Sequence, residues 1–139
     1  THVNQGNEKG QLANKLGVLG KGLADLANKL GPELKNTTIA VISEFGRTVK
    51  ENGNGGTDHG HGNVMILLGA GIAGGKVHGK WRGLDSSKLF EGRDLPVTTD
   101  YRSVLSGILG EQMMLSSVNL KSIFPDFQST DKVQDMFKG

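Results

Sequence analysis

Leucines recur in the N-terminal part of the chain at alternating steps of four and three residues. The repeat consists of Leu12, Leu16, Leu19, Leu23, Leu26 and Leu30. Because an α-helix turns once in about 3.6 residues, these side chains predict one apolar stripe along a helix. A coiled-coil seam is the alternative, but the repeat spans fewer than three heptads. Three glycines interrupt the stripe, each costing about 1 kcal/mol relative to alanine, so we expect the leucine face to pack on a sheet. Gly31-Pro32 is expected to end the helix.

Two short apolar runs follow the expected helix. Residues 37–42 are rich in β-branched side chains, and residues 63–68 read Asn-Val-Met-Ile-Leu-Leu. Continuous apolar runs of this length are typical of buried strands in a parallel sheet. Alternating helices and strands predict an α/β fold with a parallel or mixed sheet covered on both faces. Two strands do not make such a sheet, so we expect the others upstream or in a second chain.

A second helix is predicted after a threonine pair. Thr98 or Thr99 can cap it, Asp100 suits its first turn, and Gly110 is expected to end it. Its expected buried face comprises Tyr101, Val104, Leu105, Ile108 and Leu109.

The length of 139 residues fits one domain, so we expect residues 1–139 to form a single partial domain. Residues 128–139 are polar and are expected to be a mobile tail. The 22 glycines follow no strict repeat, which predicts many tight turns in a loop-rich fold.

Charge and cysteine content exclude several classes of site. The net charge is +2 with acids and bases interspersed, so there is no basic stripe for nucleic acid. The absence of cysteine excludes disulfides, thiolate metal sites and a cysteine nucleophile. No apolar run approaches the ~18 residues that span a bilayer, so this segment is expected to have no membrane span.

The strongest candidate for chemistry is the glycine-rich loop after the first expected strand. The strand stops at Ser43 and Glu44, and the loop then supplies Asp58, His59 and His61 within four positions. In an extended segment, positions 59 and 61 point the same way. Carboxylate and imidazole suit divalent zinc, manganese or iron. The alternative is a polar turn with solvated histidines, and the residues alone leave both open.

Two further residues near this loop have alternative roles. Arg47 could bind phosphate or sulfate through two hydrogen bonds, or it could pair with Glu44 or Glu51 on the surface. Ser43 has no Gly-x-Ser-x-Gly elbow around it, so we expect it to support the turn.

A glycine run after the second expected strand has the spacing of a dinucleotide-binding motif. That motif requires a helix to start at its third glycine, here Gly74. Residues 76–83 have glycine every few positions and no helical period. We therefore predict a glycine-rich turn at residues 69–75 rather than a nucleotide site.

Five ordered motifs stand out in the chain, namely Thr1-His2-Val-Asn-Gln-Gly, Ser43-Glu-Phe-Gly-Arg-Thr, Asn52-Gly, Gly56-Thr-Asp-His-Gly-His-Gly and Gly92-Arg-Asp-Leu-Pro-Val-Thr-Thr-Asp-Tyr-Arg. Together they resemble the sulfatase-like bacterial family called domain of unknown function 1501, of the alkaline phosphatase-like superfamily. The resemblance implies the C-terminal part of a three-layer α/β/α fold with a mostly parallel sheet. It also implies an aspartate before Thr1, in an Asp-Thr-His motif.

The resemblance further implies a metal-dependent hydrolase of phosphate or sulfate esters. Its relatives hold one or two divalent metal ions, here of the zinc, manganese or calcium class, on aspartates and histidines at strand ends. Their nucleophile is a serine, threonine or modified cysteine, and we expect it outside this chain. The implied partners are a small anionic ester and the N-terminal part of the same protein or a second chain. An exported or periplasmic location is also implied.

Two alignments with the superfamily compete. In one, Asp58-His59 is its Asp-His metal pair. In the other, Ser43-Glu44-Phe45-Gly46 replaces a Ser-Asp-His-Gly motif, so Phe45 stands in place of a ligand and His59 or His61 supplies a later histidine. The resulting candidate ligands are His2, Glu44, Asp58, His59 and His61, and the candidate substrate contacts are Arg47 and Asn52. The alternative function is a non-catalytic binding or secreted structural protein with a degraded metal site.

Overall fold

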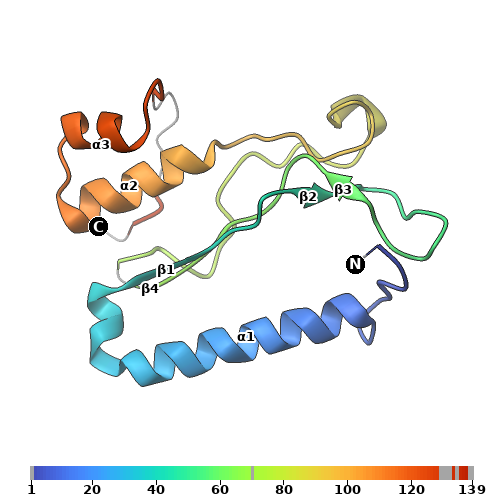
Figure 1. The fold of residues 1–139 in the computed structure, drawn as a ribbon, viewed down its shortest axis with the longest axis horizontal. Coiled ribbons are helices and arrows are strands. Elements are labelled where there is room, and N and C mark those ends of the chain that lie inside the picture. Colours follow the sequence, from blue (N-terminus) through green and yellow to red (C-terminus); the bar gives the residue numbers. More distant parts are fainter. Residues whose placement is uncertain (1, 70, 129–132, 134, 138–139) are drawn as a thin grey trace. The chain divides into compact units, whose positions relative to one another are not determined.

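The computed structural model describes residues 2–69, 71–128, 133 and 135–137 (Figure 1). The chain divides into two compact units, each built from three separate segments. The first unit comprises Thr1–Leu34, Ile42–Val64 and Arg82–Val97, and the second comprises Lys35–Val41, Met65–Trp81 and Thr98–Gly139. Most of the expected mobile tail at residues 128–139 lies outside the described residues, as does Thr1. The single partial domain stays a prediction.

The first unit contains the long helix α1, Gln11–Leu30, at the position that the leucine repeat predicts. Gly31 ends it with a φ of 48° and donates its backbone N–H to Ala27, so the predicted stop is confirmed. The 3-10 helix η1 (Gly31–Asn36) follows directly. No residue of α1 is buried, and Leu16 is 53% exposed. The expected burial of the leucine face is therefore not found among the described residues.

Two short strands of the first unit hold the candidate loop. β2 (Gly46–Arg47) pairs antiparallel with β3 (His59–Gly60), so that Arg47 lies opposite His59 (Figure 1). Both glycines are required by close backbone contacts. A Cβ atom on Gly46 would overlap the carbonyl of Gly62, and one on Gly60 would overlap the backbone of Arg47. The loop can therefore return tightly enough to place β3 beside β2.

Residues 82–97 complete the first unit. They include the 3-10 helix η2 (Ser86–Lys88) and Asp94, which forms isolated bridges with Thr48 and Phe90. The Asp94 side chain is 2% exposed, and it accepts hydrogen bonds from Nε and Nη2 of Arg93 at 2.9 and 3.0 Å. These bonds raise the pKa of Arg93. The bridge between Asp94 and Thr48 places this segment beside the residue that follows β2.

The second unit contains β1 (Thr38–Val41), which lies within the first apolar run, and β4 (Ile66–Gly69), which overlaps the end of the second. They pair antiparallel, with Thr38 opposite Gly69. The expectation of buried parallel strands is wrong for this pair, because no residue of either strand is buried. Parallel neighbours need a crossover, usually a helix, and residues 42–65 contain only β2 and β3. The mostly parallel sheet of the implied larger fold stays a prediction.

Two helices pack together in the second unit, namely α2 (Tyr101–Met113) and α3 (Ser117–Ile123) (Figure 1). The predicted cap of α2 is wrong, because Asp100 is the N-cap and accepts the N–H of Arg102. Hydrogen bonds from the Arg102 guanidinium to the same carboxylate lower the pKa of Asp100. The predicted stop at Gly110 is also wrong, since the helix continues to Met113 and is capped by Met114, which has a left-handed backbone conformation. One glycine costs only about 1 kcal/mol, which packing against α3 can offset.

The buried apolar side chains of the described residues belong to the second unit. They are Ile72, Val104 and Met136. Ala73 donates its N–H to the Met136 carbonyl, and Ile72 forms a bridge with Phe137. Val104 lies on the face of α2 that the sequence predicted to be buried, whereas Tyr101 on the same predicted face is 55% exposed. In the described part of residues 69–83 no helix forms, so the prediction of a glycine-rich turn is confirmed.

Among the described residues, none of the helices is both long enough and apolar enough to cross a membrane.

Candidate functional site

The candidate site forms where the N-terminal segment lies against the glycine-rich loop of the first unit. Asn4 and Gln5 donate backbone N–H groups to the carbonyls of Asn54 and Gly55 at 3.0 and 2.8 Å. Gly56 is buried beneath this contact, and a Cβ atom there would come within 2.5 Å of the His2 carbonyl. The absence of a side chain at position 56 therefore allows His2 to reach the loop.

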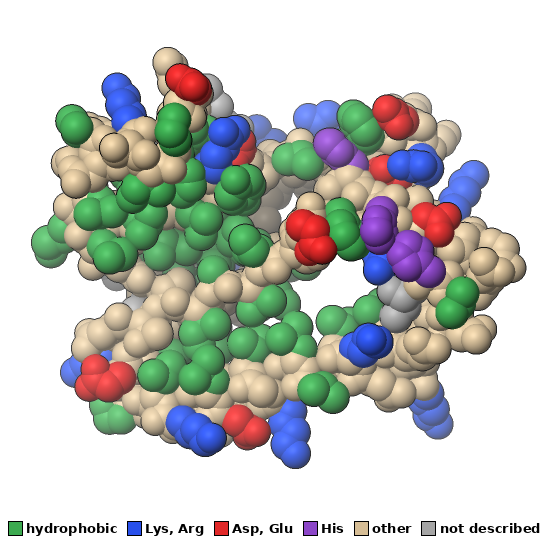
Figure 2. Space-filling view, viewed as in Figure 1, with side chains coloured by type: hydrophobic (Ala, Val, Ile, Leu, Met, Phe, Trp, Pro, Cys, Tyr) green, Lys and Arg blue, Asp and Glu red, His purple; other side chains and the backbone are tan. Residues whose placement is uncertain are grey.

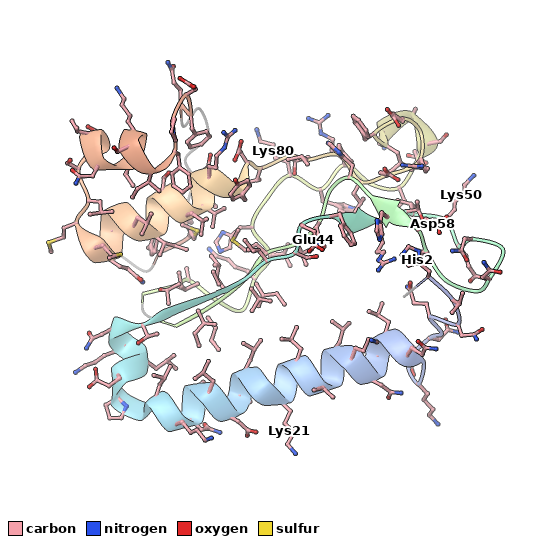
Figure 3. The ribbon with its side chains drawn as sticks, viewed as in Figure 1. His2, Lys21, Glu44, Lys50, Asp58 and Lys80 are labelled. Atoms are coloured by element: carbon pink, nitrogen blue, oxygen red, sulfur yellow. The ribbon has the colours of Figure 1, made fainter. Side chains whose placement is uncertain are left out.

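Three of the five candidate ligands come together at this contact. His2 Nε2 lies 3.0 Å from His59 Nε2, and His2 Nδ1 lies 3.4 Å from Asp58 Oδ1. Figure 3 shows His2 beside Asp58, the loop residue that precedes β3, and Figure 2 shows histidines beside acidic and basic side chains on this face. The side chains of His2 and Asp58 are 53% and 62% exposed. The cluster is therefore open to solvent.

Arg47 adds a cation to the same cluster. Its Nη1 donates to the Thr57 carbonyl at 2.9 Å and lies 3.4 Å from His2 Nε2. Because arginine remains protonated at all ordinary pH values, this group can only donate. Arg47 Nη1 and His59 Nε2 therefore both approach the same atom, Nε2 of His2.

Asn52 joins the two segments through its side-chain amide. Its Nδ2 donates to the His2 carbonyl and to Asp58 Oδ1, both at 2.9 Å. Its Oδ1 accepts the backbone N–H groups of Asn54 and Gly56 at 2.9 and 3.1 Å. The predicted substrate contact at Asn52 is not tested by this geometry, but the amide is fully engaged within the chain.

The hydrogen bonds define the protonation of the cluster. Bonds from Asn52 and then from His2 lower the pKa of Asp58, which is therefore ionised at neutral pH and can only accept. In the contact with His2, the Nδ1 atom can therefore only act as the donor, and Arg47 can only donate toward His2 Nε2. These contacts favour the tautomer of His2 that carries a hydrogen on Nδ1 and leaves the lone pair of Nε2 toward Arg47 and His59.

Glu44 and His61 lie apart from this cluster. Glu44 is exposed and accepts a hydrogen bond from Ser43 Oγ at 3.2 Å, and Figure 3 shows it away from His2. His61 stacks on the Phe90 ring with centroids 4.0 Å apart. Although residues 59 and 61 were expected to point the same way, only His59 reaches the cluster. Their roles as ligands stay predictions.

Phe45 has a contact that the sequence did not reveal. Its ring stacks on that of His59, with centroids 3.8 Å apart and an angle of 23° between the planes. Phe45, which one of the two expected alignments puts in the place of a ligand, therefore covers one face of His59. Thr57, also missed, donates to Gln5 Oε1 at 2.7 Å and ties the N-terminal segment down. The only feature of the sequence that could have pointed to Thr57 is its position next to the Asp58-His59 pair.

The donor set fits a divalent metal in part. Two histidine nitrogens bound to one tetrahedral zinc at 2.0–2.1 Å are about 3.3 Å apart, close to the observed 3.0 Å between His2 and His59. Asp58 on the far nitrogen of His2 matches the carboxylate that commonly orients a ligating histidine. Within the part of the chain that the structure describes, however, no group of three or more histidine or acidic side chains is set to hold a metal ion.

Fold and site together define a mixed α/β chain with an exposed histidine and aspartate cluster beside an arginine. The chain belongs to the family described as protein of unknown function (DUF1501), whose sequence model matches residues 1–124. This match confirms the family resemblance, and the membership itself assigns no activity. No curated protein and no solved structure matches the chain.

Proposed function

We propose that this protein is a metal-dependent hydrolase of phosphate or sulfate esters and that His2 and His59 hold the metal. The observation that carries the proposal is that His2 Nε2 lies 3.0 Å from His59 Nε2 and 3.4 Å from Arg47 Nη1. Two imidazole nitrogens and a guanidinium are the groups that a metal-bound anion requires.

Each side chain of the cluster has a part in this proposal. His2 and His59 bind the ion through Nε2, and Asp58 orients His2 from the opposite nitrogen. When bound, the metal polarises the ester and stabilises the charge that develops on its oxygens. Arg47 binds ester oxygens, because its planar guanidinium matches two oxygens of phosphate or sulfate.

Two nitrogen ligands are fewer than the three protein ligands typical of catalytic zinc. We propose that the remaining ligands and the nucleophile come from the N-terminal part of the same protein or from a second chain. Asp58 can supply a further oxygen, since it is exposed and ionised. The proposed substrate is a small anionic ester, and the proposed location is exported or periplasmic.

One observation favours a second candidate, a non-catalytic binding or structural protein with a degraded metal site. Phe45 occupies a position where the superfamily resemblance implies a ligand, and its ring stacks on His59. A phenyl ring cannot bind a metal, so a protein that kept the fold and lost one ligand would show this contact.

Hydrolysis of aryl phosphate and aryl sulfate by the full-length protein separates the candidates. With manganese or zinc present, we expect turnover that a chelator abolishes. We expect about a 100-fold loss in His2→Ala or His59→Ala, because each removes a proposed metal ligand. His78→Ala is the matched control, since His78 lies in the second unit against the Ala73 carbonyl. Turnover that persists in chelator, or no turnover of either ester with any metal, would contradict the hydrolase and favour the second candidate.

A further inference from the structure

We infer that Asn52 is a positioning residue that sets the tautomer of His2. Its amide fixes Asp58 Oδ1 against His2 Nδ1, so that the proton stays on Nδ1 and the lone pair of Nε2 faces His59. Presentation of that lone pair to a metal rests on the proposed function, whereas the control of the tautomer does not.

The orientation of the Asn52 amide follows from its four partners. An asparagine side chain has two N–H donors and two acceptor positions, and all four are used here. Flipping the amide would place its oxygen against the His2 carbonyl and the Asp58 carboxylate. It would also place its NH2 group against two backbone N–H donors. The loop therefore fixes which end of Asn52 faces Asp58.

This amide acts on the oxygen that faces His2. Asn52 Nδ2 and His2 Nδ1 both contact Asp58 Oδ1, at 2.9 and 3.4 Å. The Asp58 side chain is 62% exposed and would otherwise rotate into solvent. The second N–H of Asn52 holds the His2 carbonyl at 2.9 Å, so one amide fixes both partners of the aspartate–histidine contact.

The opposite edge of the His2 ring favours the same tautomer. Arg47 Nη1 lies 3.4 Å from Nε2 and can only donate, which disfavours a proton on that nitrogen. The protonated nitrogen of a histidine is set by the hydrogen bonds at both nitrogens. Asn52 therefore acts through Asp58, and its engaged amide favours this role over the predicted direct contact with substrate.

The test is the Asn52→Asp variant of the metal-free protein, studied by nitrogen-15 NMR at a pH where His2 is neutral. The aspartate keeps acceptor oxygens for the N–H groups of Asn54 and Gly56, but it loses both donors and repels Asp58. We expect the wild-type protein to show protonated Nδ1 and unprotonated Nε2. In the variant, the two nitrogen shifts should approach each other as the tautomers mix.

Asn54→Ala is the matched control, because it removes an exposed side-chain amide from the same loop while its backbone N–H bond to Asn52 persists. It should leave the His2 shifts unchanged. Asp58→Asn tests the same contact if Asn52→Asp fails to fold, and it should also mix the tautomers. The inference is overturned if the folded Asn52→Asp protein, or Asp58→Asn in its place, keeps the wild-type His2 shifts.

A zinc titration of the same proteins separates this inference from the proposed function. If both hold, Asn52→Asp should weaken zinc binding about 10- to 100-fold, as expected on losing the support of a ligating histidine. A tautomer change in a protein that binds no zinc would support the role of Asn52 and contradict the metal site. Unchanged shifts in a protein that does bind zinc would overturn the role of Asn52 alone.

Discussion

Gly56 decides whether His2 can take part in the site. It is buried against the His2 backbone, although the two residues are far apart in sequence. The sequence identified the chemically suitable types, histidine, aspartate and arginine. It could not show that His59 faces His2 while His61 stacks on Phe90, because that difference arises from the pairing of β2 with β3. The stacking of Phe45 on His59 depends on the same register.

Gly56→Ala should therefore detach the N-terminal segment from the loop. The added methyl group would meet the His2 carbonyl, and such overpacking costs about 1–3 kcal/mol. We expect the amide hydrogens of Asn4 and Gln5 to exchange about tenfold faster or more, since 1.4 kcal/mol is a factor of ten. Hydrogen exchange measured by NMR checks this. Gly53→Ala is the control, because nothing lies within 4 Å of its Cβ position, and equal exchange rates in the two variants would contradict the account.

At the scale of secondary-structure elements, the sequence predictions were most accurate where a periodic pattern was long. The six-leucine repeat predicted where α1 lies and Gly31-Pro32 predicted its end, and the two apolar runs overlap β1 and β4. The direction of the strands could not be predicted, because periodicity carries no information about pairing partners. The predicted start of α2 was wrong because Asp100, rather than a threonine, caps the helix. The sequence analysis did not predict α3, although Ser116 caps that helix by accepting the Asn119 N–H.

The glycines inside α1 make a prediction about this element. Gly20 has helical neighbours on both sides and nothing within 4 Å of its Cβ position, so Gly20→Ala should stabilise the protein by about 0.5–1 kcal/mol. Gly31→Ala should destabilise it, because Gly31 ends the helix at a positive φ of 48°. Chemical denaturation of both variants measures the two changes. A destabilising Gly20→Ala would mean that another part of the protein covers that side of α1.

At the scale of the whole molecule, the chain folds into two units made of interleaved segments. Local sequence patterns could not predict this division, because each unit is closed by contacts between residues far apart in the chain. The family match extends over residues 1–124 and includes every candidate site residue. The mostly parallel sheet, the remaining metal ligands and the nucleophile stay proposals.

The most direct test of the central claim is the stoichiometry and affinity of manganese and zinc binding to the full-length protein by titration calorimetry. The account predicts a bound divalent ion whose affinity falls about 100-fold or more in His2→Ala and in His59→Ala, since each variant removes one proposed ligand. His78→Ala should bind as the wild-type protein does. Absence of stoichiometric binding, or wild-type affinity in both His2→Ala and His59→Ala, would contradict a metal site at this cluster.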